Sequence, residues 1–275
     1  MHNRQPIGVF DSGLGGLTVL KELVRELPQY DYLYLGDSAR APYGTKDFDT
    51  VYRYTLEAVR WLFDQGCPLV IVACNTASAK ALRNIQQRDL PGIDPTRRVL
   101  GVIRPTTEVI GDHTDSGHVG ILGTQGTVDS GSYAIEIAKF FPEVHVHQQA
   151  CPAWVPLVES GDYLDASKAE PLIQQCLEQL AAQSPLIDTI LLACTHYPLL
   201  YPQIRKMLPP HIDLVTQGSI VADSLSAYLK RHPQMEERLT SGGDIEFTTT
   251  GDPIVFGRAA SQFWGASLEA RQVYL

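Results

Sequence analysis

Two cysteines stand at the ends of apolar segments that have the character of buried strands. Cys74 follows residues 69–73, and Cys194 follows residues 189–193. In an open α/β sheet, ligands bind outside the carboxyl ends of the strands, so both thiols are expected at a ligand site. We expect the start of a following helix to lower the thiol pKa. Because polar residues flank both cysteines, we interpret them as functional rather than as small apolar core side chains.

Two thiols on opposite sides of one carbon suit one reaction particularly well. Inverting a stereocentre requires that a proton is removed from one face and that another is returned to the opposite face. One sulfur must be a thiolate while the other is a thiol, and the roles exchange with the direction of reaction. Desolvation and preorganised donors must compensate for the weak acidity of the α-hydrogen. The pair therefore predicts inversion at a stereocentre without a cofactor.

Polar residues beside the cysteines could hold the substrate. Asn75, Thr76 and Thr195 carry amide or hydroxyl groups next to helix starts, where backbone N–H groups bind carboxylates. His196 could tune the thiol of Cys194, and the alternative is a solvent-facing loop histidine.

The turn after the first expected strand carries a further carboxylate. Asp11 could hold a substrate ammonium group or orient a thiol, and its alternative role is to cap the following helix. The same two interpretations apply to Ser12. The glycines of residues 13–18 do not form a dinucleotide-binding loop, because Thr18 stands where the third glycine of G-x-G-x-x-G would be.

Buried strands that alternate with helices must position these residues. Apolar runs of this kind are typical of parallel sheets covered on both faces. We expect strands at residues 7–10, 32–35, 69–73, 99–103, 119–122, 144–147, 189–193 and 212–215, and a possible edge strand at 245–250. We expect helices at residues 14–27, from 75 to about 87 and at 168–183. A further helix follows residues 123–127 and ends at about residue 140, and a final helix begins at about residue 254. The two halves follow the same plan, which predicts two pseudo-symmetric α/β lobes with the active site in the cleft between them.

The bulk composition excludes several classes of protein. The 275 residues carry a net charge of −9, which argues against nucleic acid as the main partner because phosphate binding needs a basic face. Five cysteines without Cys-x-x-Cys spacing indicate neither a disulfide framework nor a zinc site, so we expect no metal. Residues 1–6 show no signal peptide, and no segment is apolar enough to span a membrane. We therefore expect a cytoplasmic protein.

Several segments together resemble those of glutamate racemases, within the wider aspartate/glutamate racemase family. The matching segments are Phe10 to Gly16, Gly36 to Gly44, Ala73 to Ser78, Pro156 to Glu159 and Ala193 to Leu200. They are ordered and spaced as in that family, and they are specific as a set. Two segments depart from the family pattern, namely residues 104–106 and 216–218, and neither touches the cysteine motifs.

The resemblance implies roles for individual residues. It implies that Cys74 deprotonates D-glutamate and that Cys194 deprotonates L-glutamate. Asp11, Asp37, Glu159 and His196 match residues proposed to assist the two thiols. The residues implied to bind glutamate are Asp11, Ser12, Tyr43, Gly44, Asn75, Thr76, Thr195 and His196.

The resemblance also implies an architecture and a biological role. One α/β lobe is expected at residues 1–98 plus 208–275, and the second, inserted lobe at residues 99–207. No cofactor is implied, and the expected partners are the small-molecule substrate and a second copy of the chain in a homodimer. The implied role is the supply of D-glutamate for bacterial peptidoglycan, the polymer of the cell wall.

Three other functions compete with this interpretation. A racemase acting on aspartate or another α-substituted acid is disfavoured by the Tyr43-Gly44 and Thr195-His196 pairs. A glutamate sensor without catalysis would need the polar donors but not two thiols. A cysteine hydrolase would use one nucleophile and leave the second thiol unexplained.

Overall fold

The computed structural model describes residues 5–275, so the polar N-terminus discussed above lies mostly outside the described residues. The strands are β1 (Ile7–Asp11), β2 (Tyr32–Gly36), β3 (Leu69–Val72), β4 (Arg98–Gly101), β5 (His118–Gly123), β6 (His145–Ala150), β7 (Thr189–Ala193), β8 (Asp213–Val215), β9 (Ile245–Thr249) and β10 (Ala270–Gln272). The α-helices are α1 (Leu17–Glu26), α2 (Phe48–Asp64), α3 (Asn75–Lys80), α4 (Leu82–Asn84), α5 (Leu90–Ile93), α6 (Ile103–Thr107), α7 (Gln125–Asp129), α8 (Ser132–Phe140), α9 (Trp154–Glu159), α10 (Ala166–Ala181), α11 (Tyr201–Met207), α12 (Gly218–Arg231), α13 (Pro233–Glu236) and α14 (Pro253–Trp264). Short 3-10 segments are η1 (Ser38–Arg40), η3 (Ile110–His113), η4 (Asp162–Leu164) and η5 (Tyr197–Leu200), and η2 (Ile85–Asp89) is a π-helix.

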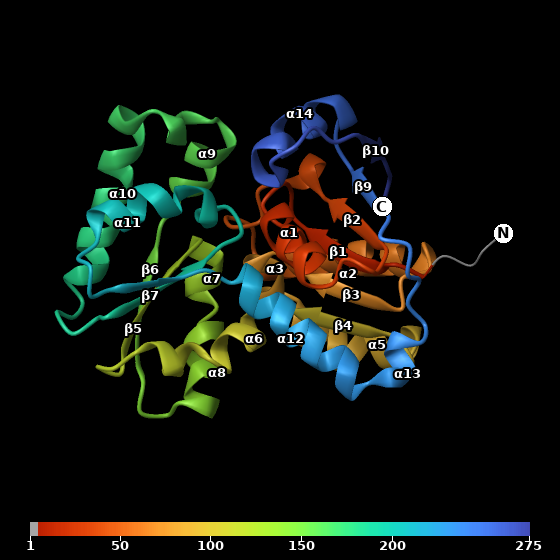
Figure 1. The fold of residues 1–275 in the computed structure, drawn as a ribbon, viewed down its shortest axis with the longest axis horizontal. Coiled ribbons are helices and arrows are strands. Elements are labelled where there is room, and N and C mark those ends of the chain that lie inside the picture. Colours follow the sequence, from red (N-terminus) through yellow and green to blue (C-terminus); the bar gives the residue numbers. More distant parts are fainter. Residues whose placement is uncertain (1–4) are drawn as a thin grey trace.

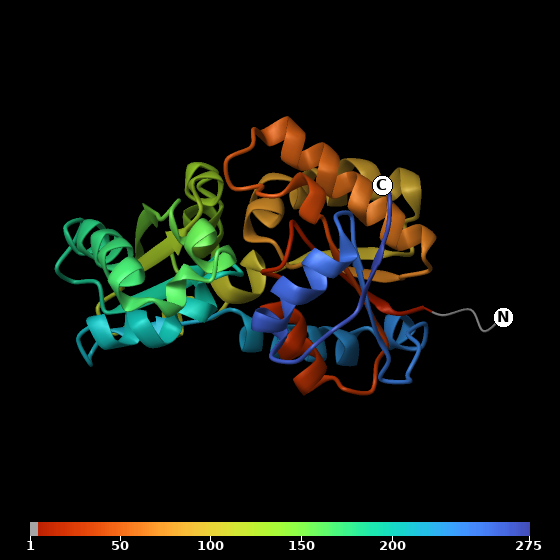
Figure 2. The same cartoon turned by 90° about the horizontal axis from the view of Figure 1, so that it is seen from above.

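Two parallel sheets organise the molecule, which confirms the expected α/β class. Within residues 5–275 the larger sheet has the strand order β10-β9-β2-β1-β3-β4 and the smaller has β6-β5-β7-β8. The order β2-β1-β3-β4 is repeated as β6-β5-β7-β8, so β3 and β7 occupy equivalent places in the two units. Two perpendicular views show the sheets in separate lobes that lie side by side (Figures 1 and 2).

Successive residues of each central strand pack into different cores, because side chains alternate across a sheet. In the first lobe Ile7 and Val9 of β1 join the core that contains Leu20 of α1. Phe10 of the same strand packs instead with Leu62 of α2. A strand that is buried on both faces needs apolar residues at nearly every position, which explains the continuous hydrophobic runs in the sequence.

Two strands lie on the other side of the expected lobe boundaries. β4 pairs with β3, with Val99 opposite Val70, so residues 99–101 complete the first sheet. β8 pairs with β7, with Leu214 opposite Ile190, so residues 213–215 complete the second. The expected division into 1–98 plus 208–275 and 99–207 is therefore wrong for these strands. The chain therefore passes from one lobe to the other after β4 and again after β8, the fourth strand of each repeat.

Two smaller expectations differ from the structure, and a third is close to it. β9 is not an edge strand, since β10 pairs with it on the outer side. The helix expected from residue 75 to about 87 is interrupted at Ala81, where α3 gives way to α4 and the π-helix η2. α14 begins at Pro253 beside its N-cap Asp252, close to the expected start. None of the helices among the described residues is long and apolar enough to cross a membrane.

Candidate active site

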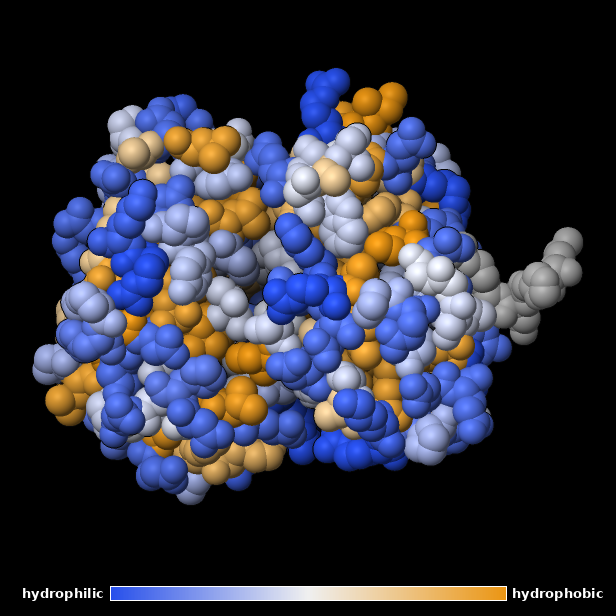
Figure 3. All heavy atoms as spheres, viewed as in Figure 1, coloured by the Kyte–Doolittle hydropathy of each residue, from blue (hydrophilic) through white to orange (hydrophobic). Residues whose placement is uncertain are grey.

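The carboxyl ends of the central strands of both sheets meet at one cavity. β1 and β3 end in the first lobe at residues 11 and 72, and β5 and β7 end in the second at residues 123 and 193. The residues that line the cavity come from both lobes: Ser12, Ala41, Pro42, Tyr43, Gly44, Thr45, Cys74, Asn75, Thr76, Thr124, Gln125, Pro152, Val155, Pro156, Glu159, Cys194, Thr195 and His196. A notch separates the two lobes at the top of the space-filling view (Figure 3). The cavity lies where parallel sheets bind ligands.

The size of the cavity suits a small ligand. Its volume is about 90 Å³. By the same measure one water molecule needs roughly 10–15 Å³, so the cavity has room for a molecule of several heavy atoms. Both cysteines face this space, and each is only 5% exposed. A reaction in the cavity is therefore shielded from bulk water.

Cys74 occupies the N-cap of α3. Its sulfur accepts a hydrogen bond from the backbone N–H of Ala77 at 3.5 Å, and the thiol donates to the hydroxyl of Ser12 at 3.5 Å. Burial raises the pKa of the Cys74 thiol to about 12, and the nearby carboxylate of Asp11 adds to the rise. The expectation of a lowered pKa is therefore wrong for Cys74, because desolvation outweighs the hydrogen bond from Ala77 that favours the thiolate.

Cys194 follows β7 and faces a histidine. Its sulfur lies 4.0 Å from Nδ1 of His196, and Nε2 of His196 lies 3.0 Å from Oε1 of Glu159. Burial alone would lower the pKa of His196, but its partners Cys194 and Glu159 outweigh that effect and raise the pKa to about 10. The ring thus lies between the sulfur of Cys194 and the carboxylate of Glu159, and Glu159 holds it in place.

Asp11 lies behind the cavity, where it is fully buried. Its carboxylate accepts a hydrogen bond from the backbone N–H of Gly13 at 2.9 Å and from the hydroxyl of Thr195 at 3.4 Å. Burial raises the pKa of Asp11, and the charge of His196 acts in the opposite direction. The carboxylate therefore positions neighbouring groups from both lobes rather than lining the cavity wall.

Hydrogen bonds join the two lobes along one side of the cavity. The hydroxyls of Thr76 and Thr124 are 2.9 Å apart. The backbone N–H of Gly126 donates to the carbonyl oxygen of Gly44 at 2.9 Å. These contacts hold the first-lobe loop at residue 44 and the start of α3 against the start of α7.

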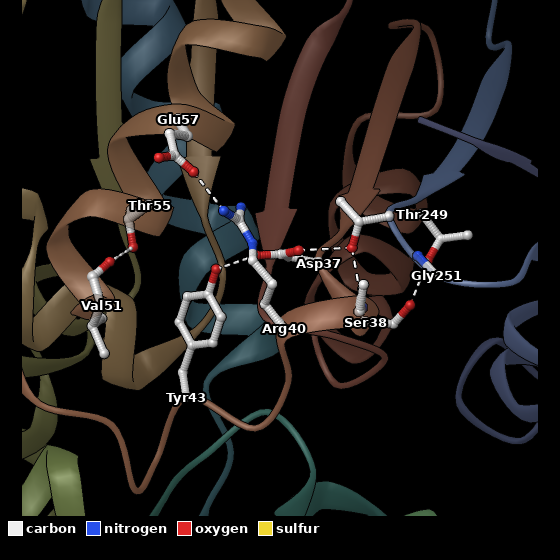
Figure 4. Close-up of polar contacts among 11 residues, drawn as sticks. Asp37, Ser38, Arg40, Tyr43, Val51, Thr55, Glu57, Thr249 and Gly251 are labelled. Atoms are coloured by element: carbon white, nitrogen blue, oxygen red, sulfur yellow. Dashed lines mark hydrogen bonds and ion pairs between the residues drawn. The ribbon is translucent and has the colours of Figure 1, made fainter. Parts of the chain in front are cut away.

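A buried carboxylate supports the cavity wall at Tyr43 (Figure 4). The phenol of Tyr43 donates to Asp37, which also accepts from Nε of Arg40 at 2.6 Å and from the hydroxyl of Thr250 at 2.7 Å. A second nitrogen of Arg40 bonds to Glu57 of α2. Asp37 is fully buried by this network and acts on the cavity through Tyr43.

The structure gathers most of the sequence-predicted site residues around the cavity and places two behind its wall. The residues in the lining are Ser12, Tyr43, Gly44, Cys74, Asn75, Thr76, Glu159, Cys194, Thr195 and His196, and those behind are Asp11 and Asp37. Sequence reasoning missed Thr124, Gln125 and Val155. The repeat could have indicated Thr124, because it follows β5 just as Ser12 follows the equivalent strand β1. Val155 lies on α9, and nothing in the sequence distinguished this apolar residue from those of the core.

Sequence comparisons place the chain among racemases. The family described as Asp/Glu/Hydantoin racemase matches residues 7–218. The chain is 40% identical over 267 residues to a glutamate racemase of Ruegeria pomeroyi, with 94% of this chain and 96% of that protein covered. It is 38% identical over 277 residues to a glutamate racemase of Bacillus cereus, with 100% of this chain and 99% of that protein covered.

Solved structures agree with this placement. A glutamate racemase isoform of Bacillus anthracis superposes with a TM-score of 0.89 and 32% identity, over 100% of this chain and 99% of that one. A glutamate racemase of Francisella tularensis, in complex with D-glutamate, superposes with a TM-score of 0.86 and 29% identity. The match covers 99% of this chain and 98% of that one. The chain therefore belongs to the Asp/Glu/Hydantoin racemase family and is an isomerase of the amino acid racemase type.

Proposed function

We propose that this protein interconverts L- and D-glutamate by two-base proton transfer at the α-carbon. The observation that carries the proposal is that Cys74 and Cys194 follow equivalent strands of the two lobes and line one cavity. Two similar bases, one from each pseudo-symmetric half, meet the requirement for proton exchange on opposite faces of one carbon.

The proposed reaction proceeds through a carbanion. The thiolate of one cysteine removes the α-proton, and the electron pair of the C–H bond remains on the carbon, delocalised into the carboxylate. The thiol of the other cysteine donates its proton to the opposite face and becomes a thiolate. Cys74 removes the proton of D-glutamate, and Cys194 removes that of L-glutamate. No cofactor takes part in these steps.

Polar groups of the lining would hold the substrate. The side-chain nitrogen of Asn75 is buried and makes no hydrogen bond within the described part of the chain, so it can donate to a carboxylate. The hydroxyls of Thr76 and Thr195 lie beside the two cysteines and line the same cavity. Such donors stabilise the negative charge that develops on the carboxylate in the transition state.

His196 and Glu159 assist on the Cys194 side. The imidazole can exchange a proton with the sulfur at 4.0 Å, and Glu159 fixes the orientation of the ring. Asp11 assists from behind the cavity by holding Thr195 and the turn at Gly13. We propose these three as assistants to the thiols rather than as the groups that touch the α-hydrogen.

The similar proteins support glutamate as the substrate. The relatives described above are glutamate racemases, and one of them holds D-glutamate in its solved structure. We further propose that the protein works in the cytoplasm as a homodimer and supplies D-glutamate for bacterial peptidoglycan. Light scattering on purified protein would test the dimer, which a single mass near 30.3 kDa would contradict.

The test of the function is solvent-deuterium exchange without any added cofactor. L- and D-glutamate are incubated separately with dialysed protein in deuterium oxide, and the α-proton signal and optical rotation are followed. We expect both enantiomers to gain α-deuterium and to converge on a racemic mixture. Aspartate is run in parallel: turnover of aspartate instead of glutamate would contradict the proposed substrate, and binding of glutamate without exchange would indicate a sensor.

Three cysteine variants test the mechanism. Replacing Cys74 or Cys194 by serine should reduce racemisation by at least about 100-fold, the contribution typical of a positioned acid or base. Cys67→Ala is the matched control, because Cys67 is a buried thiol in the core beneath β3 and does not line the cavity. Racemisation at the wild-type rate in either serine variant would contradict the two-base mechanism.

A further inference from the structure

We propose that Gln217 fixes the direction in which Asn75 presents its side-chain amide to the substrate, and that Gln217 is thus a positioning residue for the racemase. The inference rests on the proposed function and adds a residue to it that does not line the cavity. Gln217 is 5% exposed and forms the N-cap of α12, at the second crossing between the lobes.

The surroundings of Gln217 determine which end of its amide is the donor. Its Nε2 lies 2.9 Å from Oγ1 of Thr106 and 3.2 Å from the carbonyl oxygen of Val102. Thr106 donates its only hydroxyl proton to the same carbonyl, at 2.9 Å. Both neighbours can therefore only accept, so the NH₂ group of Gln217 must face them. The two segments that depart from the family pattern thus contact each other here.

The NH₂ group of Gln217 also faces Tyr133, and it determines the direction of the hydrogen bond between Tyr133 and Asn75. Nε2 of Gln217 lies 2.6 Å from the phenol oxygen of Tyr133, which accepts the hydrogen bond. Tyr133 then has one proton to donate, and it donates to Oδ1 of Asn75. Burial raises the pKa of Tyr133, so the phenol keeps the proton that this bond requires.

The end of this chain of hydrogen bonds lies in the cavity. Because Oδ1 of Asn75 accepts from Tyr133, Nδ2 must point elsewhere. Nδ2 is buried and makes no hydrogen bond with the described residues, and Asn75 lines the cavity. The bond directions therefore leave two N–H donors for a substrate carboxylate.

The chain of bonds also connects elements from both lobes. Asn75 belongs to the first lobe and Tyr133 to α8 of the second, while Thr106 lies on α6 at the first crossing. α6 packs against both α8 and α12 (Figure 1). The direction of the Asn75 amide is consequently tied to the arrangement of both crossings.

The variant Gln217→Glu tests the inference because it replaces the donor by an acceptor of the same shape. Tyr133 would then donate to the carboxylate at position 217 and accept from Nδ2 of Asn75. The carbonyl oxygen of Asn75 would face the substrate carboxylate. We expect KM and the dissociation constant for glutamate to rise at least about tenfold, with a smaller change in kcat.

A double-mutant cycle separates this effect from a general loss of packing. In a Tyr133→Phe background the chain of bonds is already broken, so Gln217→Glu should add less than about a twofold change. Gln86→Glu is the charge-matched control, since Gln86 donates to the carbonyl of Val99 and lies outside the cavity lining. Equal effects of Gln217→Glu in both backgrounds, or an unchanged KM in the single variant, would overturn the inference.

A neutron structure tests the inference independently of glutamate turnover. Deuterium atoms locate the amide nitrogen of Asn75 directly in ligand-free protein. We expect Nδ2 on the cavity side in the wild type and on the Tyr133 side in Gln217→Glu. An Asn75 amide with the same orientation in both proteins would refute the proposed role of Gln217. Wild-type protein that does not racemise glutamate would refute only the proposed function.

Discussion

The sulfur of Cys194 lies 4.0 Å from His196, whose other ring nitrogen lies 3.0 Å from Glu159. Burial disfavours the charged imidazole, but the two partners outweigh burial and raise its pKa to about 10. An unfolded histidine has a pKa of about 6.5. His196 therefore binds its proton more tightly in the folded protein, which links folding to pH.

The sign of this linkage leads to the first prediction. A raised pKa in the folded state contributes stability that is fully present below about pH 6.5 and is lost as pH rises through about 10. His196→Gln removes this contribution. The difference in free energy of unfolding between wild type and variant should be at least about 1 kcal/mol larger at pH 6 than at pH 10. Urea unfolding at a series of pH values measures it, and parallel profiles for the two proteins would contradict it.

The raised pKa of Cys74 predicts how its alkylation depends on pH. Only the thiolate reacts, and burial raises the pKa of this thiol to about 12. The rate at which iodoacetamide modifies Cys74 should therefore rise about tenfold per pH unit between pH 7 and 9. Peptide mass spectrometry follows Cys74 separately from the other cysteines. Glutamate should slow the modification, and a rate that is independent of both pH and glutamate would place this thiol outside the substrate site.

Gly15 packs directly against the Cys194 side of the site. A Cβ atom at Gly15 would lie 2.2 Å from Oγ1 of Thr195 and 2.5 Å from Nδ1 of His196. Gly15→Ala must displace one of them, so we expect a loss of about 1–3 kcal/mol in stability and a lower kcat. Gly13→Ala in the same loop is the control, because its Cβ would meet only Ala41, at 3.8 Å. Thermal unfolding and racemisation assays compare the two variants, and equal behaviour would contradict the prediction.

The fold could be predicted because buried parallel strands appear in the sequence as short, continuous apolar runs. The runs at β1, β3 and β7 are apolar at nearly every position, and polar residues follow each of them. Equivalent placement of Cys74 and Cys194 in a repeated unit then indicated a shared site. These two properties depend on local sequence, so no tertiary information was needed.

The features that could not be predicted depend on contacts between residues far apart in the sequence, and such contacts leave no local sequence pattern. The sheet to which β4 and β8 belong is decided by which neighbour each strand pairs with, and apolar runs do not encode that choice. The pKa of Cys74 depends on burial and on Asp11, which is 63 positions away in the sequence. The role of Gln217 depends on bonds to Thr106 and Tyr133, residues from other elements.

The network at Asp37 gives the last prediction. Tyr43→Phe removes a hydrogen bond to a fully buried carboxylate, and Arg40 and Thr250 are then its remaining side-chain partners. Loss of one donor to a buried charge should lower the free energy of unfolding by about 1.5–3 kcal/mol, measured with urea. Tyr52→Phe is the matched control: this tyrosine donates to the half-buried Asp89 at 2.6 Å, where water can replace the lost bond, so its cost should stay below about 1 kcal/mol. Equal costs would mean that burial of Asp37 does not strengthen its bond with Tyr43.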